Sequence, residues 1–221
     1  SNVQNFCEVN GALYFTASDP IHGIELWKTD GTAAGTVLVK DIEPGSDGSN
    51  PSSLCNLNGT LIFVASTSLY GTEIWKSDGT VEGTIMIKDI YQGHSSSPVL
   101  ITIINNELYF IAADGIHGYE LWKSDGTTAG TVMVKDINPG PDASDISELT
   151  NINGTLFFRA FTDTYGYELW KSDGTTAGTM MVKDIDVGPD DSFISELTNI
   201  NGTLFFRAFT DTYGSELWKS D

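Results

Sequence analysis

The stretch YELWKSDGTTAGT, residues 167–179, decides the fold, because closely similar stretches occur along the whole chain. Its tryptophan recurs at intervals of 48, 47, 48 and 48 residues, at Trp27, Trp75, Trp122, Trp170 and Trp218. A constant period of this length is typical of one supersecondary unit that is copied along a chain. We therefore divide the chain into repeats one to five, at approximately 1–48, 49–96, 97–144, 145–192 and a shortened 193–221.

Repeat four predicts four short strands, over residues 147–152, 155–161, 167–171 and 179–185. The dipeptide Asn153-Gly154 is typical of a type I′ hairpin turn between the first two strands, because both residues tolerate positive φ. In the second strand, Leu156 and Phe158 share one face, whereas Phe157 and Phe161 share the other. Both faces are mostly apolar, so we expect the sheet to be covered on both sides.

Four short antiparallel strands that repeat about every 48 residues and are buried on both faces match the blades of a β-propeller. A β-solenoid normally repeats over far fewer residues. The sequence therefore predicts an all-β chain whose residues 1–221 form a single β-propeller domain of about five four-stranded blades. The last blade is expected to be incomplete, because repeat five stops at Asp221, before its fourth strand.

The copies of the central motif begin at Glu25, Glu73, Glu120, Glu168 and Glu216, and they read ELWKTDGT, EIWKSDGT, ELWKSDGT, ELWKSDGT and a clipped ELWKSD. They resemble the ELWxxDGT repeat family of bacterial proteins, and the resemblance covers essentially the whole chain. It implies a repeat protein of propeller-like architecture that is exported or held at the cell surface. It implies no defined common activity.

The missing fourth strand of repeat five is expected to leave an open sheet edge, which invites pairing with another chain. We expect either that the sequence is a segment of a longer repeat protein or that a neighbouring molecule supplies the strand. The second alternative predicts self-association through the open last blade, which would give a fibre or a ring.

Composition argues against several kinds of partner. A net charge of −19 and a pI near 4.2 disfavour nucleic acid, whose binding depends on clustered lysine and arginine. No stretch approaches the roughly 20 apolar residues that span a bilayer. Two cysteines, Cys7 and Cys55, are too few for a disulfide scaffold, and we expect two small buried thiols.

The motif residues suggest structural roles. Asp in Trp-Lys-Ser-Asp-Gly-Thr is suited to accept a hydrogen bond from the backbone N–H two residues on, while Gly supplies a backbone conformation that other residues resist. Glu and Lys are expected to pair across strands at a blade edge. The tryptophans have two interpretations: packing between blades, which we favour, or ligand-binding platforms on which sugars stack.

The loops after the fourth strands carry acids at alternating positions around a glycine. This pattern suits Ca²⁺, which prefers carboxylate and carbonyl oxygens. The candidate ligands, three in each of three repeats, are Asp41, Glu43, Asp47, Asp136, Asn138, Asp142, Asp184, Asp186 and Asp190. Repeat two breaks the pattern, no loop has the bidentate glutamate of an EF-hand, and solvated turn acids are the alternative interpretation.

Signatures of catalysis are absent from the sequence: there is no Gly-x-Ser-x-Gly elbow, no phosphate-cradling glycine loop and no His-Glu-x-x-His. We therefore expect an extracellular or surface module without catalytic activity. It would bind a protein or glycan through the loops 46–53, 92–98, 141–145 and 189–193, where the repeats differ most. The rival hypotheses are a lectin-like propeller, an enzyme acting at the channel mouth, and a self-assembling matrix or filament component.

Overall fold

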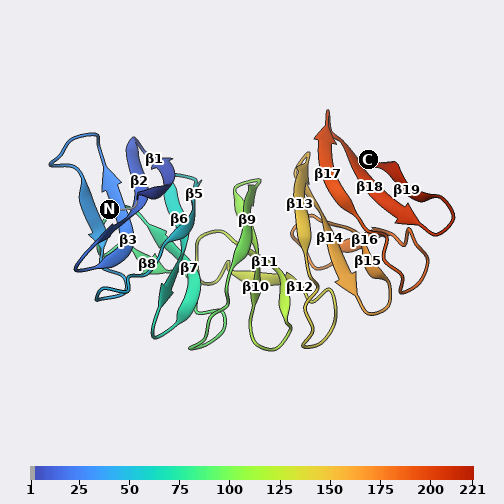
Figure 1. Cartoon of the computed structure of the whole chain (residues 1–221), viewed down its shortest axis with the longest axis horizontal. Helices are drawn as coiled ribbons and strands as arrows, with labels where there is room; N and C mark the ends of the chain where they lie inside the picture. Colours follow the sequence, from blue (N-terminus) through green and yellow to red (C-terminus); the bar gives the residue numbers. More distant parts are fainter. Residues whose placement is uncertain (1–2) are drawn as a thin grey trace. The chain divides into compact units, whose positions relative to one another are not determined.

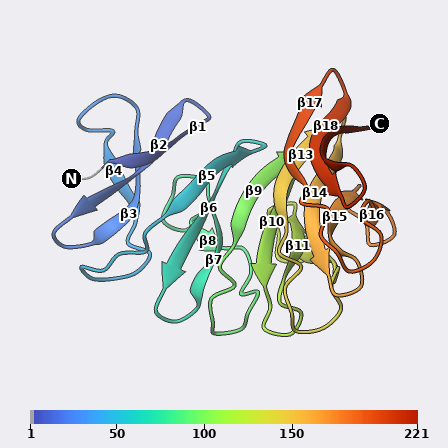
Figure 2. The same cartoon turned by 45° about the vertical axis from the view of Figure 1, so that its right-hand side comes forward.

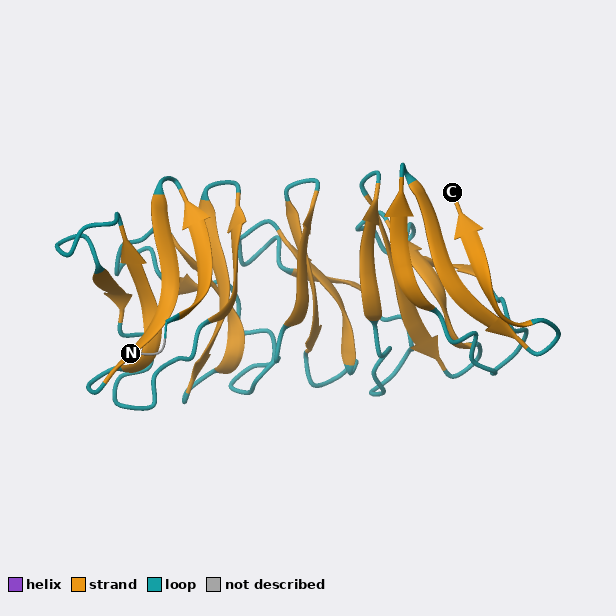
Figure 3. Cartoon of the chain, turned by 45° about the horizontal axis from the view of Figure 1, so that its top comes forward, coloured by secondary structure: helices purple, strands orange, loops and turns teal. Residues whose placement is uncertain are grey.

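The computed structural model describes residues 3–221, and these residues form nineteen strands and no helix (Figure 3). No helix of this part of the chain is therefore long and apolar enough to cross a membrane. The strands make five antiparallel sheets, one for each repeat. Four sheets have four strands in sequence order, and the sheet of repeat five has three. The predicted all-β class and four-stranded repeat are confirmed, whereas closure into a propeller stays a prediction.

The strands of each repeat follow one another with nearly the same spacing along the sequence, and Figure 1 colours them in chain order. Repeat one contains β1 (Gln4–Val9), β2 (Ala12–Asp19), β3 (Gly23–Thr29) and β4 (Val37–Lys40). Repeat two contains β5 (Ser52–Leu57), β6 (Thr60–Thr67), β7 (Gly71–Ser77) and β8 (Ile85–Met86). Repeat three contains β9 (Val99–Ile104), β10 (Glu107–Ala113), β11 (Tyr119–Ser124) and β12 (Val132–Lys135).

Repeat four contains β13 (Ser147–Ile152), β14 (Thr155–Thr162), β15 (Gly166–Ser172) and β16 (Met180–Lys183), which lie in this order in one sheet (Figure 2). Repeat five contains β17 (Ser195–Ile200), β18 (Thr203–Thr210) and β19 (Gly214–Ser220). The predicted fourth strand of repeat four, 179–185, is too long at both ends. Thr179 Oγ1 donates to the Thr175 carbonyl at 2.7 Å within the turn, and the Ile185 N–H donates to Glu168 at 3.2 Å.

The predicted turns are confirmed. Asn153 and Gly154 have φ of 51° and 88°, as a type I′ hairpin requires. In the turn between β15 and β16, the Thr175 N–H donates to Asp173 Oδ1 at 2.9 Å, and Gly174 has φ of 84°. Gly178 closes this turn, because a Cβ at that position would collide with the Asp173 carboxylate. The turn therefore needs both glycines and the acid.

The chain divides into two compact units. The first comprises the residues up to Pro98 together with Ser124–Thr131, and the second comprises Val99–Lys123 with Val132–Asp221. The prediction of a single domain stays a prediction.

Within each unit, consecutive repeats share a core. One cluster joins repeats one and two through Tyr14, Leu26, Val39, Leu61, Phe63 and Trp75. Another joins repeats four and five through Phe157, Leu169, Leu204 and Phe206. Tyr14 and Leu26 lie on one face of their sheet, whereas Leu61, Phe63 and Trp75 lie on the opposite face of the next sheet. We call this contact the repeat joint.

Candidate functional site

The motif glutamate is the most deeply buried charged group of each repeat joint. Glu25, Glu73, Glu120 and Glu168 are all fully buried. Each accepts hydrogen bonds from a serine at the boundary with the next repeat: Ser49 N–H donates to Glu25 at 2.8 Å, and Ser96 Oγ donates to Glu73 at 2.6 Å. The Ser144 and Ser192 hydroxyls donate to Glu120 and Glu168 in the same way. We call this interaction the Glu–Ser clamp.

The expected pairing of motif Glu with motif Lys is therefore wrong. The glutamate faces the loop that leads into the next repeat, where backbone N–H groups complete its shell; Ile137 N–H donates to Glu120 at 3.0 Å. Burial raises the pKa of Glu73, Glu120 and Glu168 to about 7, although the hydrogen bonds from Ser96, Ser144 and Ser192 oppose the shift. These carboxyls hold the fold together and face no solvent.

The lysines make a second set of contacts between repeats. Lys28 Nζ donates to the Gly79 carbonyl in the turn of repeat two, at 2.8 Å. Lys40 Nζ donates to the Thr84 carbonyl at 2.7 Å, and Lys135 Nζ donates to the Thr179 carbonyl at 2.8 Å. The lysine on one sheet thus recognises the turn of the following sheet. These contacts fix the register between neighbouring repeats.

Three of the five motif tryptophans are buried: Trp75, Trp122 and Trp170. Trp75 belongs to the core that joins repeats one and two, and Trp170 belongs to a core of the second compact unit. Trp27 and Trp218 are half-buried. The buried indoles pack as the favoured interpretation expects, which leaves their faces covered by protein.

The candidate calcium ligands differ in their hydrogen-bond partners and in their exposure. Asp184 and Asp136 accept from Gly188 and Gly140 N–H at 3.3 and 3.4 Å, within their own loops. Glu43, Asn138 and Asp186 reach the next repeat, where they accept from the backbone N–H groups of Ser68, Asp163 and Asp211. The remaining members are half-buried Asp41 and exposed Asp47, Asp142 and Asp190.

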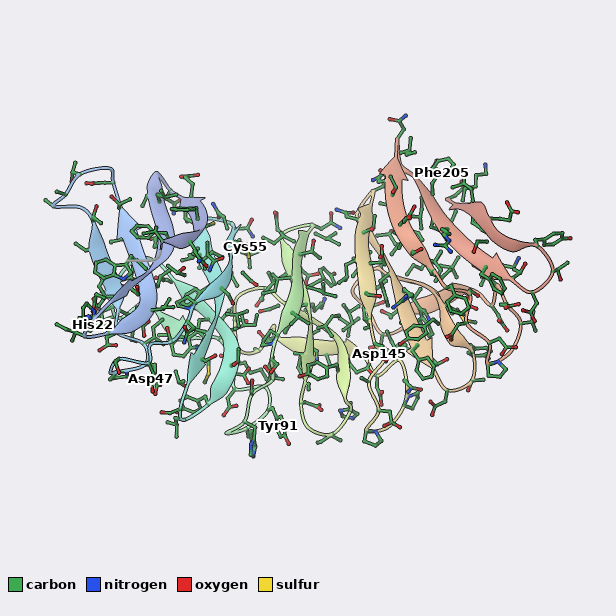
Figure 4. All side chains as sticks on the ribbon, in the orientation of Figure 1. His22, Asp47, Cys55, Tyr91, Asp145 and Phe205 are labelled. Carbon is green, nitrogen blue, oxygen red and sulfur yellow. The ribbon has the colours of Figure 1, made fainter. Side chains whose placement is uncertain are left out.

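Among residues 3–221, no group of three or more His, Cys, Asp or Glu side chains lies close enough to hold a metal. Figure 4 labels Asp47, which lies in the loop after the fourth strand of repeat one. Two of the nine candidates accept backbone hydrogen bonds within their own loops, as turn acids do, and three accept from the backbone of the next repeat. Calcium binding stays a prediction.

The two cysteines are free thiols on the first strands of repeats one and two (Figure 4, which labels Cys55), and both are half-buried where the sequence predicted buried thiols. Burial raises the pKa of Cys55 to about 11, so this thiol stays protonated at neutral pH. Cys7 also has a raised pKa, chiefly through burial. Neither thiol has the depressed pKa of a reactive cysteine.

Sequence reasoning missed one repeated feature of the first strands. A residue with φ between 53° and 61° interrupts each of them, at Asn5, Ser53, Leu100, Glu148 and Glu196. Strand pairing shifts register around each of these residues, as in a β-bulge. We call them the bulge positions. All five side chains are exposed, and they belong to four residue types although the backbone conformation is the same.

Two bulge positions line a hollow in the second compact unit. It measures about 510 Å³ and lies over β9, β13 and β17, where its lining residues are Leu100, Ile101, Thr102, Glu148, Leu149, Thr150 and Leu197. We call it the bulge hollow. Four aliphatic side chains, two hydroxyls and one carboxylate can hold an apolar group beside a hydrogen-bond donor or a positive charge. The signal in the sequence was weak, because side chains at bulge positions vary from repeat to repeat.

No protein-family model matches the chain, and no curated protein matches it. Solved structures do resemble it. The chain is similar over 94% of its length to 33% of a puromycin hydrolase, with a TM-score of 0.55 and 15% identity. It is similar over 94% of its length to 34% of a puromycin-hydrolyzing peptidase from Mycobacterium tuberculosis, with a TM-score of 0.51 and 11% identity.

A third structure, from a study of two prolyl endopeptidases, matches 95% of the chain with 31% of its own length, a TM-score of 0.52 and 12% identity. The chain thus spans about a third of the length of these three proteins. Likeness at such low identity concerns the arrangement of strands alone. The hydrolytic activity of those proteins belongs to them as whole chains.

Proposed function

We propose that the chain is part of a β-propeller that acts as a non-catalytic binding module, outside the cell or at a bacterial cell surface. The proposal rests on the recurring positive φ at the exposed bulge positions. Leu100 and Glu148 have φ of 54° and 61°, a conformation that costs free energy for residues other than glycine. Strain that recurs at exposed positions with different side chains is typical of a surface built to present those side chains.

The groups that recur in the repeats support the same proposal, because they form hydrogen bonds within the protein itself. The motif acid accepts hydrogen bonds in the Glu–Ser clamp, and the turn acid Asp173 accepts from Thr175. The lysines bind carbonyls of the next repeat. The bulge positions differ between repeats and are exposed, so specificity would come from the bulge hollow and not from the motif.

The lectin hypothesis gains less support. A sugar stacks on an accessible aromatic face, whereas Trp75 and Trp170 are 8% and 7% exposed. The bulge hollow offers aliphatic side chains and one carboxylate, which suit a peptide with an apolar side chain next to a lysine or arginine. A protein ligand is therefore the stronger candidate.

The test is a selection of peptides from a random displayed library on the immobilised chain, run beside a glycan array. Selected ligands are then measured against Leu100→Asp and Glu148→Arg, with Leu69→Asp as control. Leu69 is 66% exposed in the turn between β6 and β7 and is not one of the lining residues of the hollow. We expect the hollow variants to weaken peptide binding at least ~10-fold and the control to leave it unchanged.

Binding that ignores both hollow variants would overturn the assignment of the bulge hollow. Saturable glycan binding that is lost in a folded Trp122→Ala variant would support the lectin hypothesis instead. Retained circular dichroism and an unchanged melting midpoint establish that each variant is folded.

A further inference from the structure

A tyrosine hydroxyl fills the space beside the turn glycine of the following repeat in two of the repeat joints. A Cβ built on Gly79 would collide with the Tyr14 hydroxyl, and one built on Gly174 would collide with the Tyr109 hydroxyl. Both tyrosines are buried. In these two joints the hydroxyl therefore lies directly against the turn of the following repeat.

Repeat two has an aliphatic side chain at the same position. Ile62 precedes its motif tryptophan by 13 residues, as Tyr14 and Tyr109 precede theirs. The turn glycine that follows repeat two is Gly126. Among residues 3–221, the atom nearest to a Cβ built on Gly126, apart from its chain neighbours, is Leu57 Cδ2 at 3.7 Å. The space that a tyrosine hydroxyl takes in the other two joints is thus left open here.

A pocket of about 190 Å³ lies at this place. Its lining includes Leu57, Thr60, Ile62, Lys76, Asp125 and Gly126. All of its lining residues belong to the first compact unit. An apolar cavity of about 150 Å³ is large enough to bind benzene, so this pocket can hold one aromatic ring. We call it the Ile62 pocket.

Lys76 and Asp125 supply the polar groups of the pocket. Lys76 Nζ donates to the Gly126 carbonyl at 2.8 Å, and its ammonium group has further hydrogens to donate. The hydrogen bond from the Thr127 hydroxyl lowers the pKa of Asp125, which therefore stays ionised at neutral pH. A phenol hydroxyl donates one hydrogen bond and accepts another. It can therefore bind the carboxylate and the ammonium at the same time.

The tyrosine hydroxyls of the other joints lie close to carboxylates. The Tyr109 hydroxyl donates to Glu107 Oε2 at 3.1 Å. Burial raises the pKa of Tyr14, and the negative charge of nearby Asp78 raises it further. Asp78 is the turn acid that corresponds to Asp125. A phenol ring in the Ile62 pocket would thus have the same kind of acidic neighbour as the protein's own tyrosines.

We propose that the Ile62 pocket binds a small phenolic molecule in place of the tyrosine that repeat two lacks. The ring packs on Ile62 and Leu57, and the hydroxyl lies between Lys76 and Asp125. Removal of the ring from water supplies the main favourable free energy, and the hydrogen bonds favour a phenol over a hydrocarbon. The pocket shares no lining residue with the bulge hollow, so this site is independent of the proposed function.

The experiment is calorimetric titration of p-cresol into the 221-residue chain, with toluene and p-toluate as comparison ligands. We expect one p-cresol to bind per chain. Toluene lacks the hydroxyl and p-toluate carries a charge that Asp125 repels, so both should bind at least ~10-fold more weakly. Equal affinity for toluene would overturn the assignment of the hydroxyl to Lys76 and Asp125.

Two variants fill the pocket with residue types that occur at the same position elsewhere. Ile62→Tyr introduces the residue type of repeats one and three, and Ile62→Phe that of repeats four and five. The matched control is Ile21→Tyr, at a position that is 71% exposed and does not line the pocket. We expect both filled variants to bind p-cresol at least ~10-fold more weakly and the control to bind it unchanged.

Thermal melts give an independent readout and verify folding. p-Cresol should raise the melting midpoint of the unchanged chain and of the control, because it binds the folded state, and should leave the filled variants unshifted. Failure of p-cresol to bind the unchanged chain would overturn the proposal, as would undiminished binding in either filled variant that folds. Tighter binding of N-acetyltyrosinamide than of p-cresol would also overturn it, in favour of a tyrosine side chain from a protein partner.

Discussion

Repeats four and five have nearly the same sequence but very different surroundings. Residues 146–173 and 194–221 differ only at Tyr167 and Ser215. Leu169 is 1% exposed and Leu217 is 75% exposed, while Glu168 is fully buried and Glu216 is exposed. The strands and pairing register are nevertheless the same in the two copies. The sequence of one repeat therefore specifies its own sheet, whereas the following repeat determines how much of that sheet is buried.

The largest expected difference comes from the leucine. Leu169→Ala removes a buried side chain from the core shared by repeats four and five, and we expect a loss of roughly 3–4 kcal/mol of unfolding free energy. Leu217→Ala changes an exposed position and should cost less than ~0.5 kcal/mol. Denaturant unfolding measures both. Equal losses of unfolding free energy would contradict the inference that packing against the next repeat sets how much this leucine contributes to stability.

The motif glutamates of repeats four and five should also differ in their contribution to the unfolding free energy, by a smaller amount than the leucines. Glu168→Ala leaves the Ser192 hydroxyl and the Ile185 N–H without their acceptor, which we expect to cost about 2–3 kcal/mol. Glu216→Ala has no clamp to break and should be nearly neutral. Denaturant unfolding compares the pair, and hydrogen exchange at Ile185 locates the loss. A Glu168 variant as stable as its Glu216 counterpart would show that the clamp contributes nothing.

The pH dependence of stability sharpens the comparison further. Burial raises the pKa of Glu168 to about 7 from an ordinary 4.5, so the folded state binds the proton more tightly than the unfolded state. This contribution is fully present below 4.5 and is lost as pH rises through about 7. We expect the free energy of unfolding to rise when pH falls from about 8 to about 5, on the order of 1 kcal/mol for each such carboxyl. The melting midpoint should rise with it.

The turn acid Asp173 opposes this trend only at lower pH. The hydrogen bond from the Thr175 hydroxyl lowers the pKa of Asp173, which therefore stays ionised over this range. Glu168→Gln should reduce the rise in melting midpoint, whereas Glu216→Gln should leave it unchanged. Differential scanning calorimetry at several pH values distinguishes them. An unaltered pH profile in Glu168→Gln would refute the assignment of this titration to the clamp.

The smallest expected effect comes from exchanging the one residue that differs. In repeat four the Tyr167 hydroxyl donates to Asp145 at 2.8 Å, and the Arg159 guanidinium lies 4.5 Å from its ring. We expect Tyr167→Ser to cost about 0.5–1 kcal/mol. Ser215→Tyr should change stability by less than ~0.5 kcal/mol, since Phe193 stands where Asp145 would be needed. A larger effect in repeat five would contradict this ranking, and thermal melts suffice to measure it.

The sequence predicted strands and turns well, for identifiable reasons. Asn153-Gly154 and Asp173-Gly174 carry backbone preferences of their own, so their turns can be read locally. The Glu–Ser clamp could not be read so directly, because Glu168 and Ser192 lie 24 residues apart and a glutamate is usually a surface residue. The recurrence of serine at Ser49, Ser96, Ser144 and Ser192 was the available signal.

The bulge positions were harder to predict than the clamp. Leu100 and Glu148 adopt positive φ although neither residue type favours it, so no local preference marks them. The strand around them imposes the conformation. The bulge hollow depends on three first strands, β9, β13 and β17, that approach one another only after the repeats have folded and packed.

The clamp also bears on how repeat number can change during evolution. Each clamp joins a glutamate to a serine at the following repeat boundary, 24 residues on from Glu25 and Glu168 and 23 residues on from Glu73. An unequal recombination between two copies, in register, removes or adds one glutamate and one serine together. Every junction it creates again contains a matched pair. Arrays of this kind can therefore lengthen or shorten by whole repeats without first acquiring compensating mutations.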